Sequence, residues 1–309
     1  MGSPCEFRLY APTASQAESA TAAARAEVER LECKYSRFLE ESLASRINRS
    51  AGDSEGLAVD DETAALLDYA DVAHRESNGL FDPTSGILRR AWNFRSGQLP
   101  DQSAIDALLP LIGWQQLRWQ RPRLALPHAG MELDWGGFVK EYAADRVAEL
   151  CRRQGLAHGL VDLGGDLAVV GPHPDGSAWR IGIRNPRRPD RPIATLSLVG
   201  GGIATSGDYE RFMIVDGRRY AHILDPRTGW PIEGLASVSV AGAHCLVAGT
   251  ATTVALLRGE EGPGWLAGLG LPHMIVDAAG QISGTLVSGG SRRAVDHHEL
   301  GGPATPASA

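Results

Sequence analysis

The sequence lacks the short motifs that mark the commonest nucleotide-binding and zinc-hydrolase sites. It contains no GxxxxGK(S/T) phosphate-binding loop, no GxGxxG fingerprint after a predicted strand and no HExxH pair. P-loop, Rossmann and zinc-protease sites are therefore excluded. Any chemistry that the chain performs must come from groups that are spread along it.

Cysteine is scarce, and so are long apolar segments. The uncharged run from Leu235 to Leu257 carries too many hydroxyl side chains for a membrane span, and it predicts a buried strand followed by a buried helix. The four cysteines form no CxxC or CxxH pattern and are Cys5, Cys33, Cys151 and Cys245. Thiols of this kind indicate a reducing compartment. Because no signal peptide or lipobox is visible, we expect a cytoplasmic protein, or a periplasmic one if a leader has been removed.

What is present is an ordinary globular composition, with 43% hydrophobic and 22% charged residues in a chain of 309. The formal net charge of -7 and the pI near 5.7 provide no general attraction to nucleic acid or to an anionic membrane. We expect residues 1–291 to form the folded part of the chain. Residues 292–309 are rich in glycine, proline and alanine and are expected to form a mobile tail.

Helical periodicity is clearest in the first half of the chain. It predicts a helix capped by Thr13 or Ser15, a second that follows Asp60, and a third from about Val139 to Gln154. Apolar or alternating segments that predict strands come later, at 160–163, 179–183, 193–199, 212–215, 238–240 and 274–276. Early helices and late strands favour an α+β fold over a regular βαβ alternation.

Two glycine-containing segments in the first half are candidates for ligand binding. SNGLFDPTSG (77–86) predicts a helix stop and a turn whose backbone near Phe81 is free to meet a ligand, although a simple turn explains it as well. LDWGGFVKEYAADR (133–146) places Asp134 at the end of a strand and Lys140 at the start of a helix. A carboxylate and an ammonium at such a turn suit a nucleotide with a metal, and a solvated turn is the alternative.

Three later segments are more ambiguous. VDLGGDLAVVG (161–171) suits a loop that orients a ligand, or a hairpin with a bulge. The segment around 205–208 predicts a polar turn, and YAHILDPRTG (220–229) carries His222 in a strand, where a histidine is more often a core residue than a catalytic one. AHCLVAGTATTVAL (243–256) places Thr253 one helical turn after Gly249, where its hydroxyl can meet a hard cation or bond to its own helix.

Taken in order, these segments resemble the ApbE family, the FAD:protein FMN transferases. The resemblance covers nearly the whole chain and rests on MGSP, YSRFLEESLASRIN, SNGLFDPTSGILRRAW, LDWGGFVKEYAADR, LVDLGGDLAVVG, ATSGDYERF, YAHILDPRTGWP and AGTATT. It implies an α+β, T-fold-like architecture of mostly antiparallel sheets flanked by helices. In that architecture residues 1–291 are the flavin transferase domain, and FAD lies in a cleft between two intimate subdomains.

The resemblance implies a reaction and its partners. Family members transfer FMN from FAD to a threonine or serine hydroxyl of an acceptor protein in the presence of Mg²⁺, and release AMP. The expected partner is therefore a protein with an exposed threonine or serine, typically a flavin-linked electron-transfer protein. Neither nucleic acid binding nor stable membrane insertion is expected.

The resemblance also assigns roles to residues. The expected FAD contacts are Met1, Phe38, Leu80, Phe81, Asp82, Asp134, Lys140 and Ile223. Magnesium is expected at the carbonyl of Gly137 and the hydroxyl of Thr253. His222 matches the family's histidine beside the flavin diphosphate, where it bonds to a phosphate or assists proton transfer.

Two positions depart from the family pattern. The aspartate that usually ligates the metal four residues before the threonine is Gly249 here, and a tyrosine common at position 38 is Phe38. Either the ion binds more weakly, or another carboxylate such as Asp166 or Asp208 replaces the missing one. Two alternatives to the transferase remain open, an FAD pyrophosphatase that gives FMN and AMP, and a non-catalytic FAD-binding protein.

Overall fold

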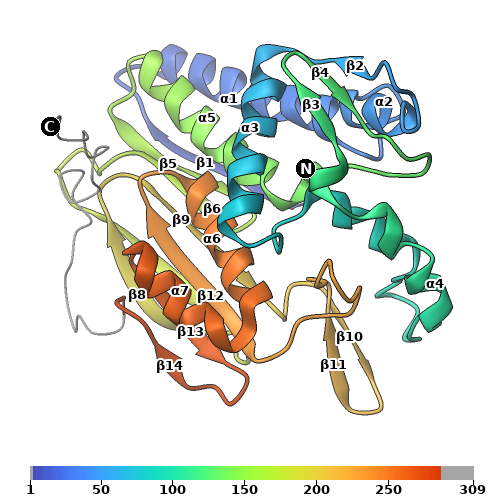
Figure 1. Cartoon of the computed structure of the whole chain (residues 1–309). Coiled ribbons are helices and arrows are strands. Elements are labelled where there is room, and N and C mark those ends of the chain that lie inside the picture. The colour runs from blue at the N-terminus through green and yellow to red at the C-terminus, as the bar shows by residue number, and fades with distance from the viewer. Residues whose placement is uncertain (1–2, 287–309) are drawn as a thin grey trace, which may run out of the picture.

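A seven-stranded sheet with the strand order β1-β5-β6-β9-β12-β13-β14 forms the centre of the structure (Figure 1). Each neighbouring pair of these strands is antiparallel. The computed structural model describes residues 3–286. The strands of the sheet are β1 (Cys5–Tyr10), β5 (His158–Leu163), β6 (Asp166–Gly171), β9 (Gly202–Gly207), β12 (Leu235–Gly242), β13 (His273–Asp277) and β14 (Ile282–Ser283).

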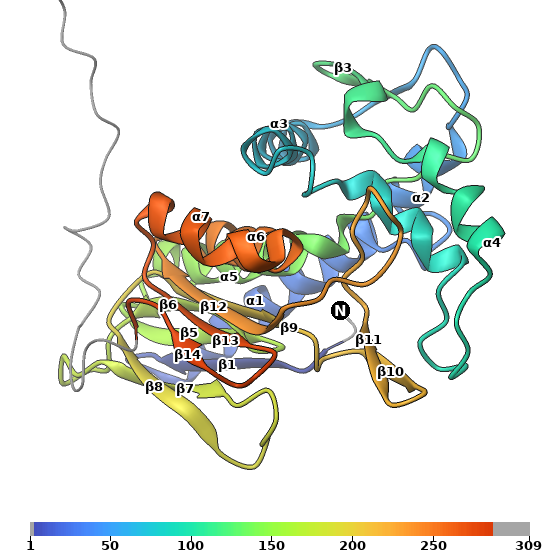
Figure 2. The same ribbon diagram turned by 60° about the horizontal axis from the view of Figure 1, so that its bottom comes forward.

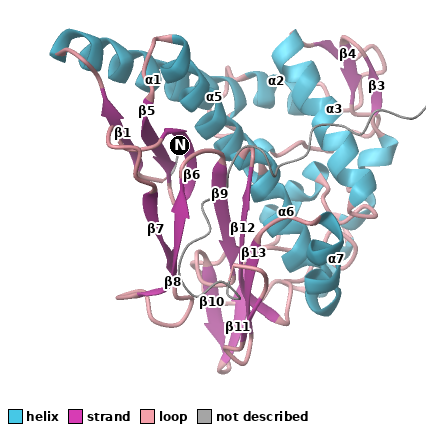
Figure 3. Ribbon diagram, turned by 90° about the vertical axis from the view of Figure 1, so that its left-hand side faces the viewer, coloured by secondary structure: helices cyan, strands magenta, loops and turns pink. Residues whose placement is uncertain are grey.

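Helices cover one face of this sheet, as Figures 2 and 3 show. They are α1 (Ala14–Tyr35), α5 (Val139–Arg153), α6 (Cys245–Arg258) and α7 (Gly262–Leu269). Helix α5 packs on β5 and β6, and α6 packs on β9 and β12. Helix α1 buries a stripe that repeats at helical spacing, from Ala20 and Ala24 through Val28 to Leu31. This apolar stripe explains why α1 lies along α5 with its charged side in solvent.

The opposite face of the sheet is covered by the hairpin of β7 (Trp179–Arg184) and β8 (Pro192–Leu198), visible below the sheet in Figure 2. Trp179 and Leu198 pack with Leu160 and Met274 of the sheet in a separate apolar cluster. The sheet is therefore buried on both faces, which accounts for the unbroken burial of β6 and β12.

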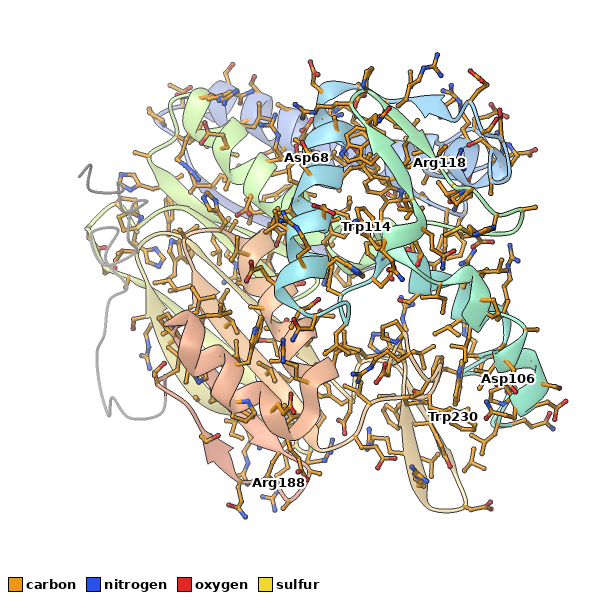
Figure 4. All side chains as sticks on the ribbon, in the orientation of Figure 1. Asp68, Asp106, Trp114, Arg118, Arg188 and Trp230 are labelled. Atoms are coloured by element: carbon orange, nitrogen blue, oxygen red, sulfur yellow. The ribbon has the colours of Figure 1, made fainter. Side chains whose placement is uncertain are left out.

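The remaining elements lie beside the sheet. They are α2 (Leu43–Arg49), α3 (Asp61–Glu76), α4 (Gln102–Asp106), the small sheet of β2 (Leu57–Ala58), β4 (Arg123–Ala125) and β3 (Arg118–Gln120), the hairpin of β10 (Phe212–Val215) and β11 (Arg218–Ala221), and the 3-10 turns η1 (Pro83–Arg90), η2 (Leu109–Leu111), η3 (Trp114–Gln116), η4 (Trp135–Gly137) and η5 (Gly259–Glu261). Trp230, labelled in Figure 4 beside α4, donates its indole N–H to Gln102 over 2.9 Å. Met213 and Tyr220 of the hairpin pack against Leu88 of η1, so the hairpin links the second half of the chain to a segment of the first half.

The predicted α+β class is confirmed, and so are the three predicted helices and the buried strand and helix over 235–257. Among residues 3–286, no helix is both long enough and apolar enough to cross a membrane. The expected tail, 292–309, lies outside the described residues.

Several local predictions are wrong. Asp134 follows no strand and instead begins the turn η4, and His222 lies just after β11 rather than within a strand. Thr205 and Ser206 belong to strand β9 instead of a turn. Strands β5 and β6 do form a hairpin, but its irregular pairing lies at Gly159 and not at the glycine pair in the turn.

The N-terminus of α6 is held by a side chain from α5. Asp145 accepts hydrogen bonds from the backbone N–H groups of Cys245 and Leu246, each over 2.9 Å. These are two of the donors that a helix leaves without intrahelical partners, and no residue of α6 itself caps them. Asp145 therefore fixes α6, with the polar residues that it carries, against α5.

We expect Asp145→Ala to lower the free energy of unfolding by about 2 kcal/mol, because it leaves two N–H groups without acceptors at a buried helix end. Urea denaturation followed by circular dichroism measures the change. Asp190→Ala, at an exposed loop position, is the matched control and should unfold like the parent. An unchanged midpoint for Asp145→Ala would show that the cap contributes nothing.

Candidate active site

Polar side chains from α5, β6, β9 and α6 meet at one edge of the sheet. Asp166 is the first residue of β6, and it accepts the backbone N–H of Thr205, near the end of the antiparallel neighbour β9, over 3.1 Å. Lys140, in the first turn of α5, forms an ion pair with the same carboxylate. Next to Thr205, the hydroxyl of Ser206 lies 3.5 Å from that of Thr253 on α6. These contacts connect Lys140 to Thr253 through a continuous set of neighbours.

The ion pair of Lys140 and Asp166 is unequally exposed. The Asp166 side chain is 3% exposed, and that of Lys140 is 30% exposed. Burial lowers the pKa of Lys140, but the negative charges of Asp166 and Glu141 outweigh it and hold the pKa above its ordinary value. The site therefore contains a stable cation with part of its surface open to an anionic ligand.

Three hydroxyl groups, from α6 and β9, lie close together beside this ion pair. The buried Thr252 donates its hydroxyl to the carbonyl of Gly249 over 2.7 Å, and this hydroxyl lies 2.8 Å from that of Ser206. Thr253 is half-buried, and within residues 3–286 its hydroxyl has only the longer contact with Ser206. Of the two threonines, Thr253 is thus the one whose oxygen remains available to a ligand or an ion.

The imidazole of His222 is held in one tautomer. Its Nδ1 lies 3.1 Å from the carbonyl oxygen of Arg211, which also accepts the backbone N–H of His222 over 2.9 Å. Because a carbonyl only accepts, Nδ1 carries the proton, and in the neutral ring Nε2 is left as an acceptor. Burial lowers the pKa of His222, and the charges of Arg211 and Lys140 lower it further, although the bond to the Arg211 carbonyl raises it. The neutral ring is therefore favoured near pH 7.

Phe38 and Asp134, two of the expected FAD contacts, are connected through Arg37. The Phe38 side chain is 82% exposed, and the guanidinium of Arg37 lies 4.6 Å from the centre of its ring. Arg37 also forms an ion pair with Asp134, whose other oxygen accepts the N–H of Gly136 over 2.9 Å. A large exposed aromatic ring next to a rigid polar turn offers a face on which a planar ligand can stack.

The segment from Leu80 to Asp82 is less open than expected. The N–H of Phe81 donates to Ser77 over 2.8 Å, and its carbonyl lies 3.1 Å from Nδ1 of His74. Asp82 accepts from the N–H of Thr84 over 2.8 Å and from the N–H of Trp114, labelled to the right of α3 in Figure 4, over 2.9 Å. The prediction that the backbone near Phe81 is free is therefore wrong, since the protein itself uses these groups.

The other expected site residues differ in exposure. Leu80 is buried, Ile223 is half-buried against the main core, and Gly137 is exposed at the end of η4, directly before α5. Met1 lies outside the described residues. Gly137 and Lys140 are thus close neighbours at one helix start, whereas Leu80 contributes to packing.

Sequence reasoning missed Glu141. A Cβ atom built on Gly249 would lie 2.6 Å from Cγ of Glu141 and 3.0 Å from its Oε1, so the Glu141 side chain fills the space beside that glycine. Each of the two substitutes proposed from sequence pairs with a cation. Asp166 pairs with Lys140, and Asp208 accepts from Arg187 over 2.6 and 2.7 Å. The sequence does contain one indication of its role, because Glu141 is a charged residue in an otherwise apolar stripe with Ala144, Ala148 and Cys151.

The environment of Glu141 is unusual for a carboxylate. The residue is 8% exposed, and its Oε2 has no hydrogen-bond partner among the described residues. Burial, together with the charge of Asp166, raises the pKa of Glu141 to about 8. No group of three or more His, Cys, Asp or Glu side chains in residues 3–286 has the geometry of a metal site. The available donors are instead carboxylate, hydroxyl and carbonyl oxygens, which suit Mg²⁺.

Comparison with known proteins identifies the family of the chain. The ApbE family model matches residues 1–275. The chain is 31% identical over 281 residues to the FAD:protein FMN transferase of Treponema pallidum, covering 84% of this chain and 77% of the relative. It is 32% identical over 267 residues to that of Klebsiella pneumoniae, covering 84% and 81%. The chain therefore belongs to the ApbE family, and the prediction from its motifs is confirmed.

Solved structures show the same fold. The ApbE protein of Thermotoga maritima superposes with a TM-score of 0.82 at 30% identity, over 90% of this chain and 93% of the other. The flavinyl transferase ApbE of Pseudomonas stutzeri, in its apo form, superposes with a TM-score of 0.81 at 30% identity, over 92% of each chain. The predicted ApbE-like architecture is confirmed.

The electrostatic coupling between Lys140 and His222 can be measured directly. We expect NMR titration to give His222 a pKa below the value of about 6.5 for an unstructured histidine. Lys140→Met should raise this pKa, because it removes a nearby positive charge, while Glu149→Gln on the same helix should leave it unchanged. A His222 pKa that is insensitive to Lys140 would show that the two groups lie too far apart to interact.

Proposed function

We propose that this chain is a Mg²⁺-dependent FAD:protein FMN transferase that passes FMN to a threonine or serine hydroxyl of an acceptor protein and releases AMP. The single observation that carries the proposal is the cluster at one edge of the sheet in which Lys140 pairs with Asp166 and the hydroxyl of Thr253 lies 3.5 Å from that of Ser206. His222 is near enough to Lys140 for their charges to interact. The names of the relatives support the same activity.

FAD binding needs a surface for the flavin and counter-charges for the diphosphate. The exposed ring of Phe38 is proposed to contact the flavin, with Asp134 and its turn beside it. Lys140 is proposed to neutralise a phosphate, since its ammonium is partly exposed and its pKa is raised. Leu80, Phe81 and Asp82 then act by shaping the wall of the site rather than by offering free bonds.

The proposed reaction is a substitution at the phosphorus of the FMN half of FAD. The acceptor hydroxyl oxygen forms a bond to that phosphorus, the bond from phosphorus to the bridging oxygen breaks, and AMP departs with the bridging oxygen. The hydroxyl proton must leave at the same time. Positioning and stabilisation of phosphate charge are the main contributions of a protein to such a reaction.

His222 is proposed to take up this proton or to donate to a phosphate oxygen. Its fixed tautomer leaves Nε2 as the acceptor, and its lowered pKa keeps the ring neutral near pH 7. The bond from Nδ1 to the Arg211 carbonyl would also stabilise the imidazolium that forms when Nε2 is protonated. His222 can therefore accept a proton without a change of ring orientation.

A magnesium ion fits the residues that are present. The hydroxyl of Thr253, the carbonyl of Gly137 and the unpartnered carboxylate oxygen of Glu141 are hard oxygen donors on adjoining elements of the part of the chain that the structure describes. When bound, the ion would neutralise the negative charge of the diphosphate. The acceptor protein is proposed to be a flavin-linked electron-transfer protein that presents its threonine or serine in a flexible loop.

The activity is tested by incubating the protein with FAD and acceptor domains from flavin-linked electron-transfer proteins, with Mg²⁺ or with EDTA. We expect a Mg²⁺-dependent mass gain of one FMN on the acceptor and one AMP released per FMN transferred. Mass spectrometry and nucleotide chromatography measure the two products. An acceptor variant in which the modified residue is replaced by alanine is the control.

Two results would contradict the proposal. Equal amounts of free FMN and AMP, formed at the same rate with and without acceptors, would identify an FAD pyrophosphatase. FAD that is bound tightly but remains intact with every acceptor would identify a binding protein.

The role of His222 makes a separate prediction. We expect His222→Ala to reduce kcat/KM at least about 100-fold, because a positioned proton acceptor contributes a factor of this order. Since the neutral form exists above the pKa and that pKa is lowered, the acidic limb of the parental kcat/KM profile should lie below about pH 6.5. Flavin fluorescence should show that FAD still binds. Full activity of His222→Ala would remove the residue from the mechanism.

A further inference from the structure

We propose that Glu141 is the carboxylate ligand of the divalent cation in this chain, and that it replaces the side chain that Gly249 lacks. The inference rests on the proposed function, because it concerns the metal of that same site. It names a residue on a different helix from the one that carries the family's aspartate.

The first observation is the position of the Glu141 side chain. Cγ, Cδ and Oε1 of Glu141 lie 2.6, 3.0 and 3.0 Å from the point where a Cβ atom of residue 249 would stand. A side chain at position 249 and the present conformation of Glu141 therefore exclude one another. The carboxylate enters the site from α5 at the place where α6 has left space.

The second observation is an unsatisfied oxygen. Glu141 is 8% exposed, and Oε2 has no hydrogen-bond donor among the described residues. A buried carboxyl oxygen without a hydrogen-bond partner is costly, and native structures rarely retain one unless a ligand or an ion completes it. Asp166, by comparison, is fully provided for by Lys140 and the N–H of Thr205.

The third observation is the set of oxygens on the neighbouring elements. Gly249 stands one helical turn before Thr253, and among residues 3–286 the Thr253 hydroxyl has a single long contact, 3.5 Å to that of Ser206. Gly137 ends the turn η4, four residues before Glu141 of α5. Carboxylate, hydroxyl and carbonyl oxygens in this combination, with room for water, are the donors that Mg²⁺ selects.

A purely structural role for Glu141 makes a different prediction. If the side chain only fills the gap beside Gly249, Glu141→Gln has nearly the same shape and should leave cation binding unchanged. If Glu141 ligates the ion, it binds as the anion after losing its proton, and Glu141→Gln should weaken binding because the amide cannot become that anion. The isosteric change thus separates packing from ligation.

The experiment counts bound Mn²⁺ by electron paramagnetic resonance, with and without FAD, using Mn²⁺ as the probe for the magnesium site. We expect the parent to bind Mn²⁺ at one site and Glu141→Gln to bind it at least about 10-fold more weakly. Glu149→Gln is the matched control, since Glu149 lies on the same helix, has a partly exposed side chain and pairs with Arg153. Thermal unfolding of each variant verifies that the fold is retained.

A relocated carboxylate provides the second test. Glu141→Ala removes the three atoms nearest to a Cβ at position 249, so Glu141→Ala with Gly249→Asp places one carboxylate on α6 without the clash with Glu141. We expect this double variant to recover Mn²⁺ binding that Glu141→Ala alone loses. Gly249→Asp alone should bind poorly, because the introduced side chain and that of Glu141 compete for the same space.

Parental Mn²⁺ affinity in Glu141→Gln, or no Mn²⁺ bound by the parent with FAD present, would overturn the inference. Failure of the proposed function looks different. Mn²⁺ binding that depends on Glu141, in a protein that transfers no FMN to any acceptor, would reject the transferase while leaving the cation site in place.

Discussion

The ion pair between Lys140 and Asp166 is the interaction on which the arrangement of the site depends. A carboxylate as deeply buried as Asp166 is stable only with a cation and hydrogen-bond donors around it, and α5 and β9 supply both. The pair holds the start of α5 against the edge of the sheet, and with it the turn at Gly137 and the carboxylate of Glu141. It also leaves an ammonium partly exposed where a diphosphate is expected.

An element could be predicted from the sequence where its contacts are local, and not where its partners lie far along the chain. Helix α1 was predicted because its buried alanines recur at helical spacing. Strand β1 was not, because its side chains are largely exposed and its pairing partner β5 lies far along the chain. Thr205 and Ser206 suggested a turn, yet they lie in a strand because their hydroxyls pair with Ser239 and Thr252 of neighbouring elements, each over 2.8 Å. No local pattern reveals such partners.

The motifs predicted which positions belong to the site, but they did not predict which hydrogen bonds and ion pairs those residues make. The sequence shows that a carboxylate is missing at Gly249, because one position can be compared with the family pattern. It does not show that Glu141 fills the same space, since the two residues lie on different helices that only the fold brings together. The two carboxylates near the motifs, Asp166 and Asp208, each pair with a cation of their own.

A polar residue can act on a ligand only through the bonds that the fold has left it. Asp82 and Asp134 stand at family positions, but each uses both of its oxygens within the protein. They support the walls of the site by fixing the turns that contain them. His222 retains Nε2, and Glu141 retains Oε2, which has no donor in the part of the chain that the structure describes. Spare bonding capacity, more than polarity or burial alone, therefore distinguishes the residues that can perform chemistry from those that hold the site in shape.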